Sequence, residues 1–97
     1  INADLVVLSA CQTGKGRIES IEGALSLPRA FIAKGVRNVL ASLWKVDDKN
    51  TMKLMQYFYE NLAKGKNYTE ALQLAKKRCI VDGMYTVDWS GFVLFGE

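Results

Sequence analysis

Short segments rich in apolar residues predict three strands in this sequence. The first covers residues 5–8 and is bounded by Asp4 and by small or polar residues at 9–16, which is typical of a strand buried on both faces of a parallel sheet. We therefore expect it to be a central strand. The segment 37–43 predicts a second strand through Val39, Leu40, Ala41 and Leu43, and the short apolar run at 91–95 predicts a third.

Helical spacing of apolar residues predicts a helix between the first two strands, from about residue 21 to residue 34. Gly35 follows it, at the position where many helices end on a left-handed residue. Pro28 cannot donate a hydrogen bond to the carbonyl of Ala24, so the helix either kinks there or begins its regular part near Ser26. The order strand, helix, strand with short connections predicts a right-handed parallel βαβ unit.

Two further helices are predicted between the second and third strands. Asp47 and Asp48 stand where an N-cap is needed, before a helix over about 49–63. Asn67, followed three residues later by Glu70, resembles a capping box that opens the next helix. The apolar stripe expected on the first of these helices comprises Met52, Met55, Phe58, Tyr59 and Leu62. The core-facing side expected on the second comprises Ala71, Leu72, Ala75 and Cys79.

Composition agrees with one compact unit rather than a disordered chain, because 49% of the 97 residues are hydrophobic and 24% are charged. The net charge is +3, and the only local basic run, at 76–78, falls on a predicted helix. A solvated helix face is therefore favoured over a nucleic-acid-binding stripe. No segment approaches the roughly 20 apolar residues of a membrane span. We interpret the chain, which begins at Ile1 without a signal peptide, as a soluble piece of a longer polypeptide.

The chain has two cysteines, Cys11 and Cys79, and no histidine. The cysteines lie far apart in the sequence and lack the spacing of metal ligands, which argues against both a disulfide framework and a zinc site. We expect no metal or other cofactor, and a reducing, cytoplasmic environment.

Catalytic and binding residues are expected in the loops that follow the first two strands, because functional sites in α/β sheets form outside the carboxyl ends of parallel strands. These loops cover residues 10–20 and 44–48, and Cys11 begins the first. Nearby backbone amides and the N-terminus of the next helix would lower the pKa of a thiol there and favour the reactive thiolate. Position alone leaves two interpretations open, because a cysteine at a strand end also serves as a small core hydrophobe.

Phosphate binding by residues 13–16, Thr-Gly-Lys-Gly, is a further alternative. A P-loop needs glycine five places before its glycine-lysine pair and Ser or Thr after it, but Ser9 and Gly16 occupy those places. The dinucleotide fingerprint lacks its third glycine, because Glu19 stands there. Neither motif supports a nucleotide-binding module, which would show saturable nucleotide binding.

The sequence from Leu8 to Gly14, Leu-Ser-Ala-Cys-Gln-Thr-Gly, resembles the nucleophile motif of CHAT domains, the caspase-like domains found with tetratricopeptide repeats. Further blocks follow the family's pattern, in its order and spacing, over nearly the whole chain. They are Ile21-Glu22-Gly23, Arg29-Ala30-Phe31, Lys34-Gly35-Val36-Arg37, Ala41-Ser42-Leu43-Trp44-Lys45-Val46-Asp47-Asp48, Glu70-Ala71-Leu72 and Trp89-Ser90-Gly91-Phe92-Val93-Leu94.

The resemblance implies that residues 1–97 are the C-terminal half of one caspase-like α/β domain, a three-layer sandwich. Its strands would be parallel except for an antiparallel last edge strand. The half that bears the catalytic histidine would lie upstream. The intact parent would be a bacterial, repeat-fused cysteine endopeptidase acting on peptide or protein substrates, and the fragment alone would be inactive. A catalytically silent scaffold or regulated interaction module is the alternative.

The resemblance also assigns roles to individual residues. Cys11 would attack the peptide carbonyl, and its own backbone amide would help to hold the oxyanion. Ser42 and Trp44 would line the peptide groove, and Lys45 would read an acidic or polar residue before the cut. Asp47 and Asp48 are a competing pair that could read a basic residue, although capping of the following helix is favoured for them.

The chain departs from the family's pattern in two places. Pro28 interrupts a helix that usually lacks proline, and Tyr85-Thr86 stand where His-Pro is often found. That histidine is not the catalytic one, so the departures concern local geometry. Cys79 is assigned to the core. Without upstream strands, residues 5–8 would present a bare apolar edge, and we expect the isolated fragment to self-associate through it.

Overall fold

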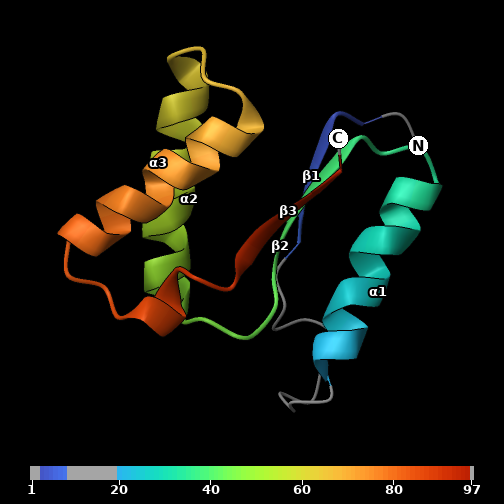
Figure 1. Ribbon diagram of the computed structural model, residues 1–97, viewed down its shortest axis with the longest axis horizontal. Coiled ribbons are helices and arrows are strands. Elements are labelled where there is room, and N and C mark those ends of the chain that lie inside the picture. Colours follow the sequence, from blue (N-terminus) through green and yellow to red (C-terminus); the bar gives the residue numbers. More distant parts are fainter. Residues whose placement is uncertain (1–2, 9–19, 97) are drawn as a thin grey trace. The chain divides into compact units, whose positions relative to one another are not determined.

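The computed structural model describes residues 3–8 and 20–96. These residues form two compact units, Ile1–Lys45 with Gly91–Glu97, and Val46–Ser90. The elements follow the chain order β1 (Leu5–Leu8), α1 (Ser20–Ala33), β2 (Asn38–Ser42), α2 (Asp48–Ala63), α3 (Tyr68–Val81), the short 3₁₀ helix η2 (Thr86–Asp88) and β3 (Phe92–Gly96), and Figure 1 labels all of these except η2. The second unit is thus inserted between β2 and β3.

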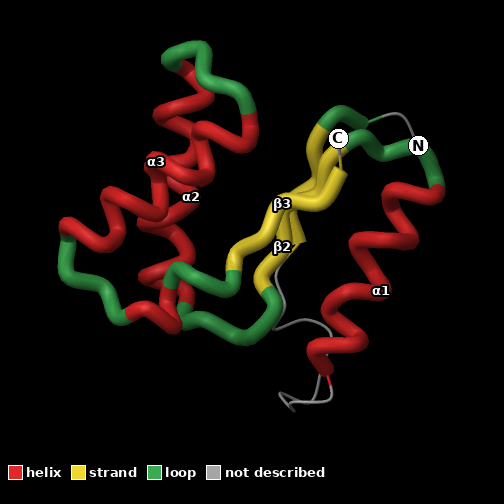
Figure 2. Tube along the Cα trace, in the orientation of Figure 1, coloured by secondary structure: helices red, strands yellow, loops and turns green. Residues whose placement is uncertain are grey.

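The strands of the first unit form one mixed sheet in the order β1-β2-β3, drawn in yellow in Figure 2. β1 runs parallel to β2, with Leu5 opposite Asn38 and Leu8 opposite Ala41. β3 runs antiparallel to β2. The expectation of parallel strands followed by an antiparallel edge strand is therefore confirmed, and the fold is mixed α/β.

The expectation that residues 5–8 form a central strand is wrong for this sheet. All five residues of β2 are buried, whereas β1 is half-buried, and Val7 is 41% exposed. The physical reason is that, among the described strands, β1 has a neighbour only on the β2 side. Its other backbone edge has no strand beside it within the described residues.

Helix α1 covers one face of this sheet. Val39 and Ala41 alternate along β2 toward the same face, and Phe31 and Ile32 of α1 pack against them. The helix runs without interruption from Ser20, with the buried Pro28 inside it, so a regular start near Ser26 is excluded. Gly35 has a φ of 102°, which is the left-handed ending that the sequence predicts.

The second unit is built around the pair α2 and α3. Leu54, Tyr57 and Phe58 are the buried residues of α2. The expected stripe is confirmed at Phe58, which is fully buried, and is wrong at Met52 and Tyr59, which are 71% and 50% exposed. Leu54 and Tyr57 are buried instead, so the buried face is turned around the helix from the expected stripe but shares Phe58 with it.

Helix α3 follows the sequence-based expectation. Its buried residues are Ala71, Leu72, Ala75 and Cys79. The side chain of Asn67 accepts a hydrogen bond from the backbone N–H of Glu70 at 2.8 Å, which caps the helix N-terminus. Cys79 is fully buried, and this burial raises the pKa of its thiol above the ordinary value of 9.0. The assignment of Cys79 to the core is therefore confirmed.

Candidate active site

The carboxyl ends of β1 and β2 define the edge of the sheet at which a site is expected. Leu8 ends β1 opposite Ala41, and Ser42 ends β2 one residue later. Because the two strands are parallel, their carboxyl ends lie at the same edge of the sheet. Cys11 follows Leu8 by three residues in the sequence and lies outside the described residues.

The chain leaving β2 is tied back to the sheet by two hydrogen bonds. Ser42 is 4% exposed, and its Oγ donates a hydrogen bond to the carbonyl oxygen of Trp44 at 2.5 Å. The N–H of Leu43 donates to the carbonyl of Gly91 at 2.9 Å, which continues the pairing of β2 with β3 one step past the strand end. The backbone of residues 42–44 is therefore held against the start of β3.

The indole of the half-buried Trp44 lies directly against Gly91. A Cβ atom built on Gly91 would stand 2.7 Å from Cε2 and 2.9 Å from Cζ2 of the Trp44 ring. Carbon atoms pack at about 3.5–4.0 Å, so the ring occupies space that an alanine methyl group would need. Sequence reasoning alone does not find this contact, because the two residues are far apart along the chain.

The charged candidates divide between the two units. Lys45 is exposed and is the last residue of the first unit before the chain enters the second. Asp47 accepts hydrogen bonds from the backbone N–H and from Nδ2 of Asn50, at 2.8 and 3.2 Å, and so caps α2. The capping role favoured from the sequence is confirmed for Asp47. Asp48 is exposed in the first turn of α2, where its negative charge suits the helix dipole.

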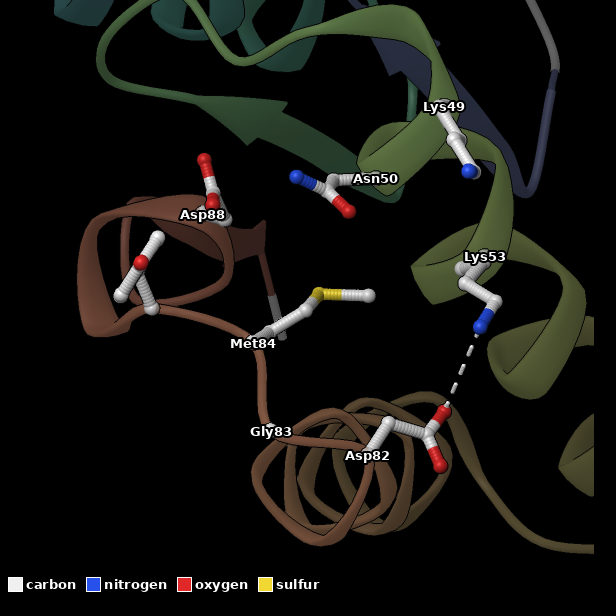
Figure 3. Close-up of a pocket in the computed structure, with 8 residues that line it drawn as sticks. Lys49, Asn50, Lys53, Asp82, Gly83, Met84 and Asp88 are labelled. Atoms are coloured by element: carbon white, nitrogen blue, oxygen red, sulfur yellow. Dashed lines mark ion pairs between the residues drawn. The ribbon is translucent and has the colours of Figure 1, made fainter.

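A hollow of about 280 Å³ in the second unit was not singled out by the sequence (Figure 3). Lys49, Lys53, Asp82 and Asp88 contribute its charges, and the thioether of Met84 points into it. Lys53 Nζ lies 3.9 Å from Asp82 Oδ2, and Tyr57 also donates a hydrogen bond to Asp82. These partners tie α2 to the end of α3, which gives the charges at this wall of the hollow a structural role.

Two classes of feature are absent from the described part of the chain. Within residues 3–8 and 20–96, no three His, Cys, Asp or Glu side chains come together in a way that could hold a metal ion. The same residues contain no helix that is both long and apolar enough to cross a membrane.

The sequence model of the CHAT domain matches residues 1–97, the whole chain. The chain belongs to the CHAT domain family. This places the CHAT chain in a caspase-like, peptidase-related family and confirms the resemblance drawn from its motifs.

Two curated relatives support the assignment. Tetratricopeptide repeat protein 28 of Mus musculus is 33% identical over 99 residues, covering 100% of this CHAT chain and 4% of the relative. Its Homo sapiens counterpart is 33% identical over 95 residues, with 96% and 4% covered. The CHAT chain thus spans a small fraction of the length of these relatives. Both relatives are named as tetratricopeptide repeat proteins, which agrees with the repeats expected in the same protein as such a domain. No solved structure matches the chain significantly.

Proposed function

We propose that the CHAT chain supplies the nucleophile, Cys11, of a caspase-like cysteine endopeptidase formed by its parent protein. The chain would be the C-terminal part of one catalytic domain, and an upstream half would supply the histidine that these 97 residues lack. Membership of a caspase-like, peptidase-related family supports this proposal.

The strand register is the observation that carries the proposal. Leu8 and Ala41 are partners in the parallel pair of β1 and β2. Cys11 follows Leu8 by three residues, and Trp44 follows Ala41 by the same number. Equal offsets from a matched pair at the carboxyl ends of parallel strands favour a common site for the nucleophile and the residues that bind its substrate.

The proposed reaction is acyl transfer. The thiolate of Cys11 adds to the carbonyl carbon of the scissile peptide, forming a C–S bond, and the backbone amide of Cys11 helps to stabilise the oxyanion. Collapse of this intermediate breaks the C–N bond, and the upstream histidine donates a proton to the leaving amine. Water, deprotonated by the same histidine, then hydrolyses the thioester and restores the thiol. The isolated chain would be inactive because it has no histidine.

Substrate selection would fall to the chain that leaves β2. Lys45 is exposed there and would attract an acidic or polar residue before the cut. Asp47 is a weaker competitor for a basic residue, since both of its carboxylate oxygens accept hydrogen bonds from Asn50. Ser42 would act mainly through the Trp44 carbonyl that its hydroxyl holds, and Trp44 would form a wall of the peptide groove.

An alkylating peptide probe applied to the full-length parent tests the proposal. We expect labelling of the wild type, loss of labelling in Cys11→Ala, and retention in Cys79→Ala, the matched control, because Cys79 is fully buried in α3. Peptidase activity that survives intact in Cys11→Ala would contradict the mechanism. A folded wild type that is neither labelled nor active would favour the alternative, a catalytically silent scaffold or interaction module.

A further inference from the structure

Gly91, the residue just before β3, is required for steric rather than conformational reasons. Gly91 is buried, and among the glycines that the structure describes, positive φ is found at Gly35, Gly65, Gly83 and Gly96 and not at Gly91. Any L-residue could therefore adopt the Gly91 backbone conformation. What excludes a larger residue is the Trp44 ring, whose Cε2, Cζ2 and Cδ2 atoms would lie 2.7–3.0 Å from a Cβ on Gly91.

The same glycine also anchors the backbone beside that ring. Its carbonyl accepts the 2.9 Å hydrogen bond from Leu43, the residue before Trp44. On the other side of Leu43, the buried Ser42 hydroxyl holds the Trp44 carbonyl. The peptide groups around Trp44 are thus fixed by hydrogen bonds, and the indole is fixed by close contact with the Gly91 backbone.

We infer that Gly91 is a positioning residue that sets the placement of the Trp44 indole for peptide binding. The inference rests on the proposed function, because it concerns the wall of the same groove. A methyl group at position 91 leaves the Leu43 hydrogen bond possible but displaces the ring. Gly91 would therefore act on peptide affinity through Trp44, and not on the reactivity of the nucleophile.

The kinetic test uses full-length wild type and Gly91→Ala. With the alkylating peptide probe, we expect the half-saturating probe concentration to rise in Gly91→Ala while the maximal labelling rate is kept, the signature of lost uniform binding. A displaced binding group can cost up to about a hundredfold in efficiency. The rate of alkylation of Cys11 by iodoacetamide should be unchanged in Gly91→Ala, because this reagent contains no peptide that must bind beside Trp44.

Gly65→Ala is the matched control. Gly65 has a φ of 92°, and a Cβ added there would meet no atom within 4 Å, so alanine strains the backbone without touching Trp44. This variant should keep the wild-type probe affinity. In a Trp44→Ala background, Gly91→Ala should have no further effect on probe affinity, because the ring that it displaces is gone. Equal losses of probe affinity in Gly91→Ala and Gly65→Ala would overturn the inference.

Hydroxyl-radical footprinting with mass spectrometry measures the solvent exposure of the Trp44 indole and does not depend on peptidase activity. Oxidation of Trp44 should rise in Gly91→Ala and stay at the wild-type level in Gly65→Ala. Unchanged oxidation in Gly91→Ala would overturn the inference even if the wild type is labelled at Cys11. Increased oxidation with wild-type probe affinity would also overturn it, since the indole would then not serve the groove. A wild type that is not labelled at Cys11 would contradict the proposed function itself. The footprint distinguishes that outcome from a wrong Gly91 inference, because it measures the exposure of Trp44 independently of Cys11.

Discussion

The phenol of Tyr57 in α2 donates a hydrogen bond to the carboxylate of Asp82, the residue that caps the C-terminal end of α3. Arg78 stacks on the Tyr57 ring at 4.7 Å from its centre and also lies 3.8 Å from Asp82. Lys53 approaches the same carboxylate from α2. The two helices are therefore joined at this end by one acidic residue shared among three partners.

The hydrogen bond to Asp82 raises the pKa of Tyr57 above its ordinary value of 10.0, with burial and the negative charge of Asp82 acting in the same direction and Arg78 opposing them. Between pH 10 and the raised pKa, the unfolded chain has lost a proton that the folded unit keeps. The contribution of Tyr57 to stability is thus fully present below pH 10 and is lost as the pH rises through the raised pKa.

In Tyr57→Phe, the free energy of unfolding should therefore fall less steeply with pH above about pH 10 than in the wild type. The measurement is pulse proteolysis of the parent across pH 8–11, followed for peptides of α2 and α3. Cys79→Ala serves for comparison, because the raised pKa of Cys79 gives a slope of the same sign that begins near its ordinary value of 9.0. An alkaline slope that is identical in wild type and Tyr57→Phe would contradict this account.

Removal of the α2 cap should loosen the start of that helix. Asp47→Ala loses the 2.8 Å hydrogen bond from the N–H of Asn50, which we expect to destabilise the first turn by about 1 kcal/mol. Asp48→Ala removes a neighbouring charge without removing the cap. Hydrogen exchange of the parent should thus accelerate at residues 48–51 more in Asp47→Ala than in Asp48→Ala, and the reverse order would disprove the capping role.

The buried face of α2 predicts opposite outcomes for two apolar residues that lie two positions apart. Leu54 is fully buried, so Leu54→Ala should cost about 2–5 kcal/mol through lost contacts and a cavity. Met52 is 71% exposed, and Met52→Ala should stay within about 0.5 kcal/mol. Exchange protection of α2 and α3 in the parent measures both. Comparable losses in the two variants would mean that Met52 is buried in the parent.

Charge reversal at Lys45 should alter substrate preference if the proposed function holds. Lys45→Glu should lower cleavage of peptides with an acidic residue before the cut and raise cleavage of those with a basic one. Because Lys45 is exposed, we expect only a roughly two- to fivefold change in each direction. Lys77→Glu, an equal charge change at an exposed position of α3, is the control. Parallel changes in both variants would assign the effect to overall charge.

Local signals explain most of what could be predicted from the sequence. Asn67 caps α3 and Asp47 caps α2, because a cap depends on residues within one helical turn. The predicted stripe of α2 is right at Phe58 but wrong at Met52 and omits Leu54, because Met52 and Leu54 are both apolar and only the packing partner decides between them. The contact of Trp44 with Gly91 was invisible for a similar reason, since it requires β3 to return beside β2.

The insertion of the second unit between β2 and β3 has a consequence for the order in which the chain can fold. The partners Ser42 and Phe92 are 50 residues apart in the sequence, whereas α2 and α3 are neighbours along the chain. Local contacts form quickly, and long-range strand pairing must first overcome the entropy of closing the intervening loop. During synthesis on the ribosome, α2 and α3 can therefore pack together before β3 has been synthesised and can pair with β2. The Trp44 indole would come into contact with Gly91 only after β3 has paired with β2.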